Sequence, residues 1–205
     1  GWIEPTEVVC TEPRTLYYQG DASEAIKLWR GGDYSQREWF LVENRQKKKW
    51  DRYLRGSGFL ITHVDDNVLT QNDEPCPGGN PCVNHYQVMV IEADNQWEMQ
   101  NGAVPVNGPW FGEAEDFFSA ETRDSLTDLS APSARDHAAQ FTGVRITGIS
   151  ASAEKMMATF GVSQTCQESP SLAVVSTRVS GGCDLDPFLD AGERVSLSVT
   201  VRNFP

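Results

Sequence analysis

The sequence predicts a mainly β protein, an antiparallel sheet or sandwich with long ordered loops. Two apolar runs, Glu38–Arg45 and Gly58–Val64, have the length of buried strands and are too short to span a membrane. Segments rich in glycine, proline and aspartate separate the short apolar runs, as turns do between strands. Near the end of the chain, Glu193–Asn203 alternates apolar and polar residues, which is the period of a strand with one buried face.

Three further short strands are expected before the first long run. They are Glu7–Cys10, Thr15–Tyr18 and Ala25–Trp29, because turn-forming residues separate them. The two long runs are then joined by a basic turn, since six of the 17 basic residues fall between positions 45 and 55. Such a charge run predicts a solvated hairpin tip, and the alternative is a contact with an acidic partner surface.

The second half of the first domain combines strands with a long loop. The consecutive apolar residues of Tyr86–Ala93 predict a central strand buried on both faces. Residues 94–142 are acidic but rich in aromatics, which argues against disorder and predicts a long ordered loop, with one short helical turn over Ser133–Gln140. Val144–Ile149 and Lys155–Val162 are expected to close the domain as a hairpin.

The composition divides the chain into a β-rich domain over residues 1–162, a polar linker over 163–171 and a second part over 172–205. The last part ends in CDLDPFLDAGERVSLSVTVRN, which resembles the first hairpin of immunoglobulin-like modules on secreted bacterial enzymes. The resemblance implies an incomplete immunoglobulin-like β module, because a whole one needs about seven strands.

The charge balance excludes several partner classes. With 17 basic and 29 acidic residues the formal net charge is −12, which argues against nucleic acids and anionic membranes as general partners. No secretory signal or long apolar run is recognised, so no membrane insertion is expected.

Five cysteines indicate an oxidising, extracellular compartment for a secreted protein. Cys76 and Cys82 bracket a tight turn of proline, glycine and asparagine and are expected to form a disulfide. Cys166 and Cys183 could form a second bridge, which leaves Cys10 unpaired or bonded outside the chain. A Cys10–Cys166 bridge remains the alternative.

Calcium is the metal that the acidic clusters favour, because hard cations prefer carboxylate and amide oxygens. The first expected calcium site follows two strand ends and consists of Asp65, Asp66, Asn67, Glu92 and Asp94. Other candidate clusters are Glu113, Glu115 and Asp116, and then Asp184, Asp186 and Asp190. None matches the twelve-residue calcium loop, and solvated turn carboxylates are the alternative for each cluster.

No catalytic residue is predicted in this chain. The three histidines, His63, His85 and His137, lack the spacing of a helical zinc motif, so zinc is not expected here. His63 and His85 are expected to be hydrogen-bonded at strand ends. The alternatives are a two-histidine metal site and a role in orienting the Asp65–Asn67 loop. Glu43 lies inside an apolar strand and is expected to pair with Arg45, rather than to face a substrate.

The stretch Arg37–Asn67 contains the strings FLVENRQ, GSGFLI and HVDDN. With later pieces at 84–94 and 143–150, it resembles the segment that follows the zinc-binding core of secreted metallopeptidases of the immune inhibitor A type. The resemblance covers roughly residues 1–162, while the family's His-Glu-x-x-His is missing from this chain.

The resemblance implies a non-catalytic β-rich scaffold, with the catalytic core as its partner and the zinc site outside this chain. It also implies structural or calcium-related roles for His63, Asp65, Asp66, His85, Glu92 and Asp94.

The alternative function belongs to another class, a structural or adhesive extracellular subunit. The alternating strand within residues 193–203 has too little chain after it to complete a module, so it could be donated to the sheet edge of a neighbouring copy. Repeated from head to tail, this contact builds a filament.

Overall fold

The structure, a computed structural model, describes residues 3–33, 36–67, 86–97, 99, 112–136, 139–162, 171–181 and 195–204. As predicted, the described chain is mainly β. It divides into two compact units, Gly1–Cys166 and Gln167–Pro205, and the boundary falls inside the expected linker.

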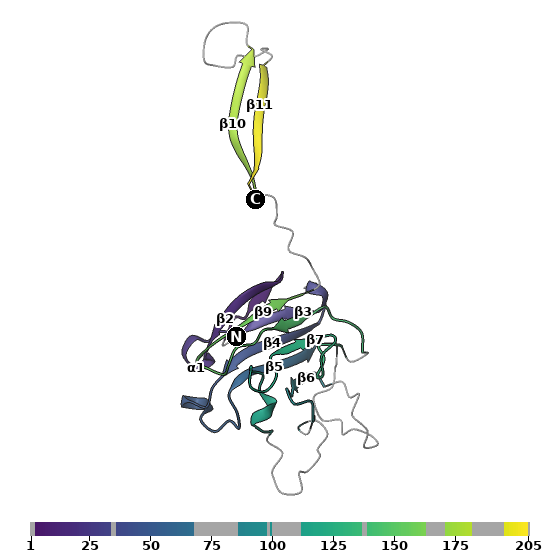
Figure 1. Ribbon diagram of the computed structural model, residues 1–205. Helices are drawn as coiled ribbons and strands as arrows, with labels where there is room; N and C mark the ends of the chain where they lie inside the picture. Colours follow the sequence, from purple (N-terminus) through teal and green to yellow (C-terminus); the bar gives the residue numbers. More distant parts are fainter. Residues whose placement is uncertain are drawn as a thin grey trace. The chain divides into compact units, whose positions relative to one another are not determined.

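The first unit is built from two sheets with short helical turns between the strands (Figure 1). Its strands are β1 Thr6–Val8, β2 Glu12–Tyr17, β3 Ile26–Trp29, β4 Glu38–Arg45, β5 Gly58–Asp65, β6 Val88–Ile91, β7 Ser125–Thr127, β8 Arg145–Thr147 and β9 Lys155–Gly161. The helices with described bounds in this unit are α1 Gln19–Ala22 and the 3₁₀ turns η1 Arg30–Gly32, η2 Lys49–Asp51 and η3 Ala114–Asp116.

The larger sheet has the strand order β1-β3-β4-β5-β6. The predicted hairpin is present as β4 and β5, paired from Glu38 with Asp65 to Arg45 with Gly58. The expectation of a purely antiparallel sheet is wrong at one edge, where β1 runs parallel to β3. Between these two strands the chain passes through β2 of the other sheet, so β3 can return in the direction of β1.

Strand β6 is an edge strand in the described part of the chain, so the prediction of a central strand is wrong. It pairs with β5, and the Val88 side chain is 45% exposed. The apolar residues of β6 lie on both of its faces, and the outer face is partly exposed. A run of consecutive apolar residues therefore did not mean burial on both faces.

The smaller sheet is antiparallel with the order β2-β9-β8-β7. The hairpin expected at the end of the domain is present as β8 and β9. Strand β7 lies in the segment that was predicted to be a loop. It was missed because three residues are too few to show the alternation of a strand. The described residues 133–136 and 139–140 contain no helix, contrary to the short helical turn expected there.

Side chains from both sheets form one apolar core. Phe40 and Phe59 of the larger sheet and Phe160 of the smaller sheet are fully buried, and the Phe59 and Phe160 ring centroids lie 6.0 Å apart. Burying each such side chain contributes about 1.5–3 kcal/mol. The alternation of β4, with every second residue buried, directs the Phe40 ring inward.

The second unit contains the strands β10 Ser171–Gly181 and β11 Val195–Phe204. They form an antiparallel pair from Ser171 with Phe204 to Gly181 with Val195, with an irregularity after Val174. The last strand therefore has a partner within the chain, β10. The partner strand, β10, contains polar residues that do not alternate regularly with apolar ones. The sequence therefore did not show the full length of β10.

Candidate functional site

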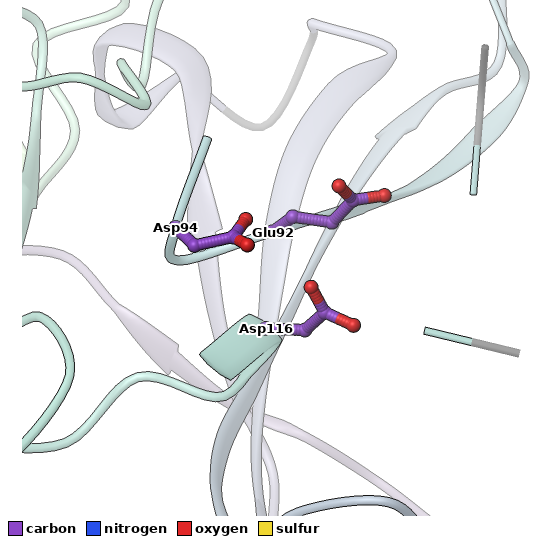
Figure 2. A group of neighbouring side chains, drawn as sticks. All are labelled: Glu92, Asp94 and Asp116. Carbon is purple, nitrogen blue, oxygen red and sulfur yellow. The ribbon is translucent and has the colours of Figure 1, made fainter. Parts of the chain in front are cut away.

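Three carboxylates converge beside the end of β6. Glu92 and Asp94 directly follow this strand, and Asp116 is the last residue of η3. One ligand oxygen from each lies within 4.8 Å of the other two. Figure 2 shows the three side chains. Glu92 is 0% and Asp116 3% exposed, while Asp94 is partly exposed. We refer to these three residues as the acidic cluster.

Backbone pairing brings the two segments of the acidic cluster together. Phe59 and Phe118 exchange two backbone hydrogen bonds of 2.9 and 3.0 Å, so the chain at Phe118 lies beside the start of β5, beyond the end of β6. The amide of Ala93 then donates to the carbonyl of Asp116 at 3.0 Å. Residues 92–94 and η3 are thereby held side by side.

Local hydrogen bonds orient each carboxylate of the acidic cluster. The amide of Met99 donates to Glu92 Oε1 at 2.9 Å, and the amide of Glu113 donates to Asp116 Oδ2 at 2.6 Å. Gln96 donates to both oxygens of Asp94 at 3.0 and 2.8 Å. The three side chains are thus positioned before any ligand arrives.

Gly112 lets the chain pass close to the acidic cluster. Its φ is +64°, and a Cβ at this position would lie 2.4 Å from Asp116 Oδ2. A residue with a side chain would be strained at this φ and would push the Asp116 carboxylate aside.

The chemistry of the acidic cluster suits a hard divalent cation. Two unit charges at 4.8 Å repel by about 3 kcal/mol at an effective dielectric constant of about 20, and burial adds to this cost. A bound cation removes both penalties. The donors are oxygens alone, which favours calcium or magnesium over zinc.

The structure separates the calcium site expected from the sequence into two parts. Antiparallel pairing of Val64 with Val88 and Ile61 with Ile91 places the end of β5 and the end of β6 at opposite ends of the sheet. Asp65–Asn67 therefore lies roughly 16 Å along the strands from Glu92, and the expected grouping is wrong.

The separated residues have local partners instead. Asp65 Oδ1 accepts hydrogen bonds from the Asn67 amide at 2.9 Å and from Asn67 Nδ2 at 2.8 Å. Asp116, which the sequence assigned to another cluster, joins Glu92 and Asp94. The bridge between Phe59 and Phe118 that brings it there leaves no pattern in a single sequence.

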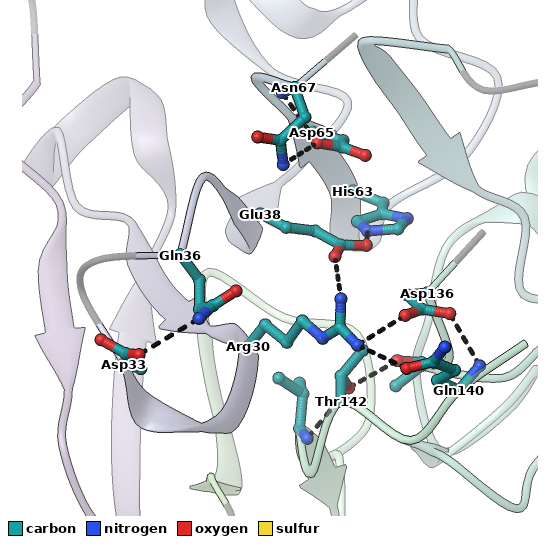
Figure 3. A network of polar contacts seen from close by, with 12 residues as sticks. Arg30, Asp33, Gln36, Glu38, His63, Asp65, Asn67, Asp136, Gln140 and Thr142 are labelled. Carbon is teal, nitrogen blue, oxygen red and sulfur yellow. Dashed lines mark hydrogen bonds and ion pairs between the residues drawn. The ribbon is translucent and has the colours of Figure 1, made fainter. Parts of the chain in front are cut away.

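His63 belongs to a buried polar network that joins β4 and β5 to the rest of the first unit (Figure 3). His63 Nε2 lies 2.8 Å from Glu38 Oε1, with the two side chains 2% and 5% exposed. The Phe40 ring stacks on the imidazole with centroids 4.4 Å apart. Arg30 bridges Glu38 at 3.2 Å and Asp136 at 2.8 Å. The geometry fits the structural role expected for this histidine, while Arg30 and Asp136 were missed.

The expected ion pair of Glu43 and Arg45 is present on the outer side of β4. Arg45 Nη1 lies 3.6 Å from Glu43 Oε1, and Arg45 Nη2 donates to Asp51 at 2.6 Å. Burial raises the pKa of the Glu43 carboxyl, and the Arg45 charge offsets only part of this effect. The sequence did not single out Asp51 as the second partner.

The remaining expected site residues lie outside the described residues. They are His85, Cys76, Cys82, Cys166, Cys183, Asp184, Asp186 and Asp190. Cys10 is disulfide-bonded, so the expectation of an unpaired Cys10 is wrong.

None of the helices in the described ranges has both the length and the apolar character needed to cross a bilayer. The chain matches no protein-family model, no curated protein and no solved structure.

Proposed function

We propose that the Gly1–Cys166 unit is a non-catalytic extracellular β scaffold that binds calcium through the acidic cluster. The observation that carries this proposal is the approach of Glu92, Asp94 and Asp116 to within 4.8 Å, with two of the three buried. Buried carboxylates this close require a positive partner or a proton.

Calcium fits this site better than magnesium or zinc. Calcium accepts carboxylate and carbonyl oxygens in flexible geometry, and extracellular modules bind it with dissociation constants of about 10⁻⁴–10⁻³ M. The ion would link the end of β6 to η3 and so fasten the acidic loop to the larger sheet. Its role is structural, because it stabilises the folded form alone.

We place this scaffold in a secreted metallopeptidase of the immune inhibitor A type, with the zinc ligands elsewhere in that protein. The strings in Arg37–Asn67 support this assignment, as does the use of His63 in a buried network with Glu38. The finer arrangement that we propose is a sandwich, in which the two sheets pack face to face. The shared core with the ring contact of Phe59 and Phe160 supports it.

Thermal unfolding with and without calcium tests the proposal. Calcium at about one hundred times its dissociation constant should add about 2.7 kcal/mol, which raises the melting temperature by several degrees. Excess chelator should reverse the shift. Equal melting temperatures in calcium and chelator would remove calcium from this proposal, and zinc-dependent cleavage of casein by this chain would contradict its non-catalytic character.

A second candidate function is assembly through the Gln167–Pro205 unit. In the described residues β10 and β11 form a sheet of two strands, and an isolated two-stranded sheet is marginally stable in water. We propose that a strand of a neighbouring copy extends this sheet, which would build a filament. Electron microscopy should then show polymers, whereas a monodisperse 22.7 kDa species at high concentration would contradict assembly.

A further inference from the structure

The loop between β4 and β5 presents two aromatic side chains to solvent. We call residues Lys47–Arg55 the hairpin tip. Trp50 is 89% and Tyr53 80% exposed, although each ring can bury a large apolar area in an interface. The Arg52 guanidinium lies over the Tyr53 ring at 4.6 Å. Tryptophan, tyrosine and arginine are the residues that most often dominate binding energy at protein interfaces.

Hydrogen bonds hold the hairpin tip in a defined conformation. The Tyr18 hydroxyl donates to the carbonyl of Lys48 at 2.7 Å, and the amide of Asp51 donates to the same carbonyl at 2.8 Å. Arg45 Nη2 donates to Asp51 Oδ1 at 2.6 Å, and the amide of Leu54 donates to the Asp51 carbonyl at 2.9 Å. The exposed rings therefore stand on a preorganised turn, which lowers the entropy cost of binding.

The hairpin tip is a narrow positive ridge on an acidic chain. Positions 45–55 contain six of the 17 basic residues and one of the 29 acidic residues. Lys48 and Lys49 are ion-paired with Glu154 and Asp21 of the same unit, so part of this charge is already compensated. Lys47 and Arg52 are exposed: Arg52 lies over the Tyr53 ring, and Lys47 Nζ donates to the carbonyl of Arg55 at 3.3 Å.

Carboxylates border this ridge on its other side as well. A Cβ on Gly56, at the base of the hairpin tip, would lie 2.8 Å from the Cα of Ala114 in η3. Ala114 stands between the exposed residues Glu113 and Glu115. A broad anionic surface, such as a membrane or a nucleic acid duplex, would press against these carboxylates and be repelled.

We propose that the hairpin tip is a docking site for an acidic polypeptide segment. Trp50 and Tyr53 make the apolar contacts, while Lys47 and Arg52 pair with carboxylates of the segment. A single extended segment fits the ridge because it can follow the tip without approaching the bordering carboxylates. The function goes beyond calcium binding and does not depend on it.

Fluorescence anisotropy with a labelled peptide of Glu-Glu-Leu repeats tests the proposal on the whole chain. Wild type should bind this peptide and should not bind a peptide of Lys-Lys-Leu repeats. Trp50→Ala should weaken binding about tenfold, and Lys47→Glu combined with Arg52→Glu should weaken it by about tenfold or more. Raising the salt concentration should also weaken binding, because exposed ion pairs are screened.

Matched controls come from the same unit. Phe141 is 61% exposed with the Arg135 guanidinium over its ring at 4.5 Å, which resembles the Tyr53 and Arg52 pair. Phe141→Ala and Arg145→Glu should leave peptide binding unchanged. If the charge-reversal variant unfolds, as circular dichroism would show, Lys47→Gln with Arg52→Gln replaces it.

Three results would overturn the proposal. They are the absence of peptide binding by wild type, binding that survives Trp50→Ala and the charge variants, and binding that Phe141→Ala weakens equally. Phosphatidylserine vesicles and heparin serve as competing probes. If either binds through Trp50 while the acidic peptide does not, the partner is not a polypeptide.

Discussion

The amide nitrogen of Ala93 lies 3.0 Å from the carbonyl oxygen of Asp116, and this hydrogen bond joins two acidic segments that the sequence keeps apart. Through it the carboxylates of Glu92 and Asp94 meet that of Asp116. The candidate metal site therefore depends on a backbone contact between a strand end and a 3₁₀ turn.

The first prediction separates this site from the grouping expected from the sequence. Asp116→Asn should lower calcium affinity at least about tenfold, because it removes one of three charges from the acidic cluster. Asp65→Asn should leave it unchanged, since Asp65 lies at the opposite end of the sheet. Isothermal titration calorimetry of both variants with calcium checks this. A loss of affinity in Asp65→Asn but not in Asp116→Asn would favour the site expected from the sequence.

The second prediction concerns Asn44, which is 0% exposed in the core. Its Nδ2 lies 3.1, 3.0 and 3.2 Å from the carbonyl oxygens of Leu16, Ala153 and Glu154, and so links β4 to the smaller sheet. Asn44→Ala should lower the free energy of unfolding by about 2–4 kcal/mol, because buried carbonyls lose their donor. Urea denaturation measures the change, and a loss below about 0.5 kcal/mol would show that water replaces the side chain.

The third prediction compares Arg30, which pairs with two buried carboxylates, with Arg14, which pairs with a partly exposed one. Arg30→Met leaves the carboxylates of Glu38 and Asp136, each side chain 5% exposed, without their shared guanidinium. It should destabilise the protein by about 3–5 kcal/mol. Arg14→Met removes an ion pair with Glu12 whose side chains are 32% and 36% exposed, and should cost less than about 1 kcal/mol. Equal losses in chemical denaturation would contradict the role given to the buried network.

The fourth prediction concerns the pH dependence contributed by Glu43. Because burial raises its pKa in the folded state, the folded form holds this proton more tightly than the unfolded form. Stability from this group is present at low pH and is lost as the pH rises through the folded-state pKa. Glu43→Gln removes this loss, so the variant should gain stability relative to wild type between about pH 4 and about pH 7. Denaturation at both values checks the sign, and a constant difference would contradict it.

The fifth prediction identifies the partner of Cys10 as Cys166. The register of β2 and β9 pairs Glu12 with Phe160, so Cys10 lies near the level of Val162, four positions before Cys166. Non-reducing peptide mapping should recover these two cysteines in one linked fragment. A fragment that links Cys10 to Cys183, or to any cysteine other than Cys166, would contradict this assignment.

Local pattern predicted the strands of the hairpins, and it predicted the limits of β4, β5 and β9 to within one residue but made β8 too long. The β4–β5 pair followed from two apolar runs around a basic turn, and β8–β9 from two runs around Ala151–Ala153. The acidic cluster was not predictable in this way. Its third member depends on the bridge between Phe59 and Phe118, a contact between distant parts of the chain that has no period in the sequence.

Burial was also harder to predict than strand identity. Val88 and Val90 are apolar on an outer face, so the sequence of β6 looks the same as that of a central strand. Conversely, Glu38 and His63 are polar and yet buried, because each provides the other with a partner. Side-chain polarity alone therefore gave the wrong environment in neighbouring strands of the same sheet.

Gly56 sets how closely the base of the hairpin tip approaches η3. No methyl group fits between its backbone and that of Ala114. The base of the hairpin and the turn that ends at Asp116 are therefore in close backbone contact. A side chain at residue 56 would have to push η3, and Asp116 with it, away from the base of the hairpin.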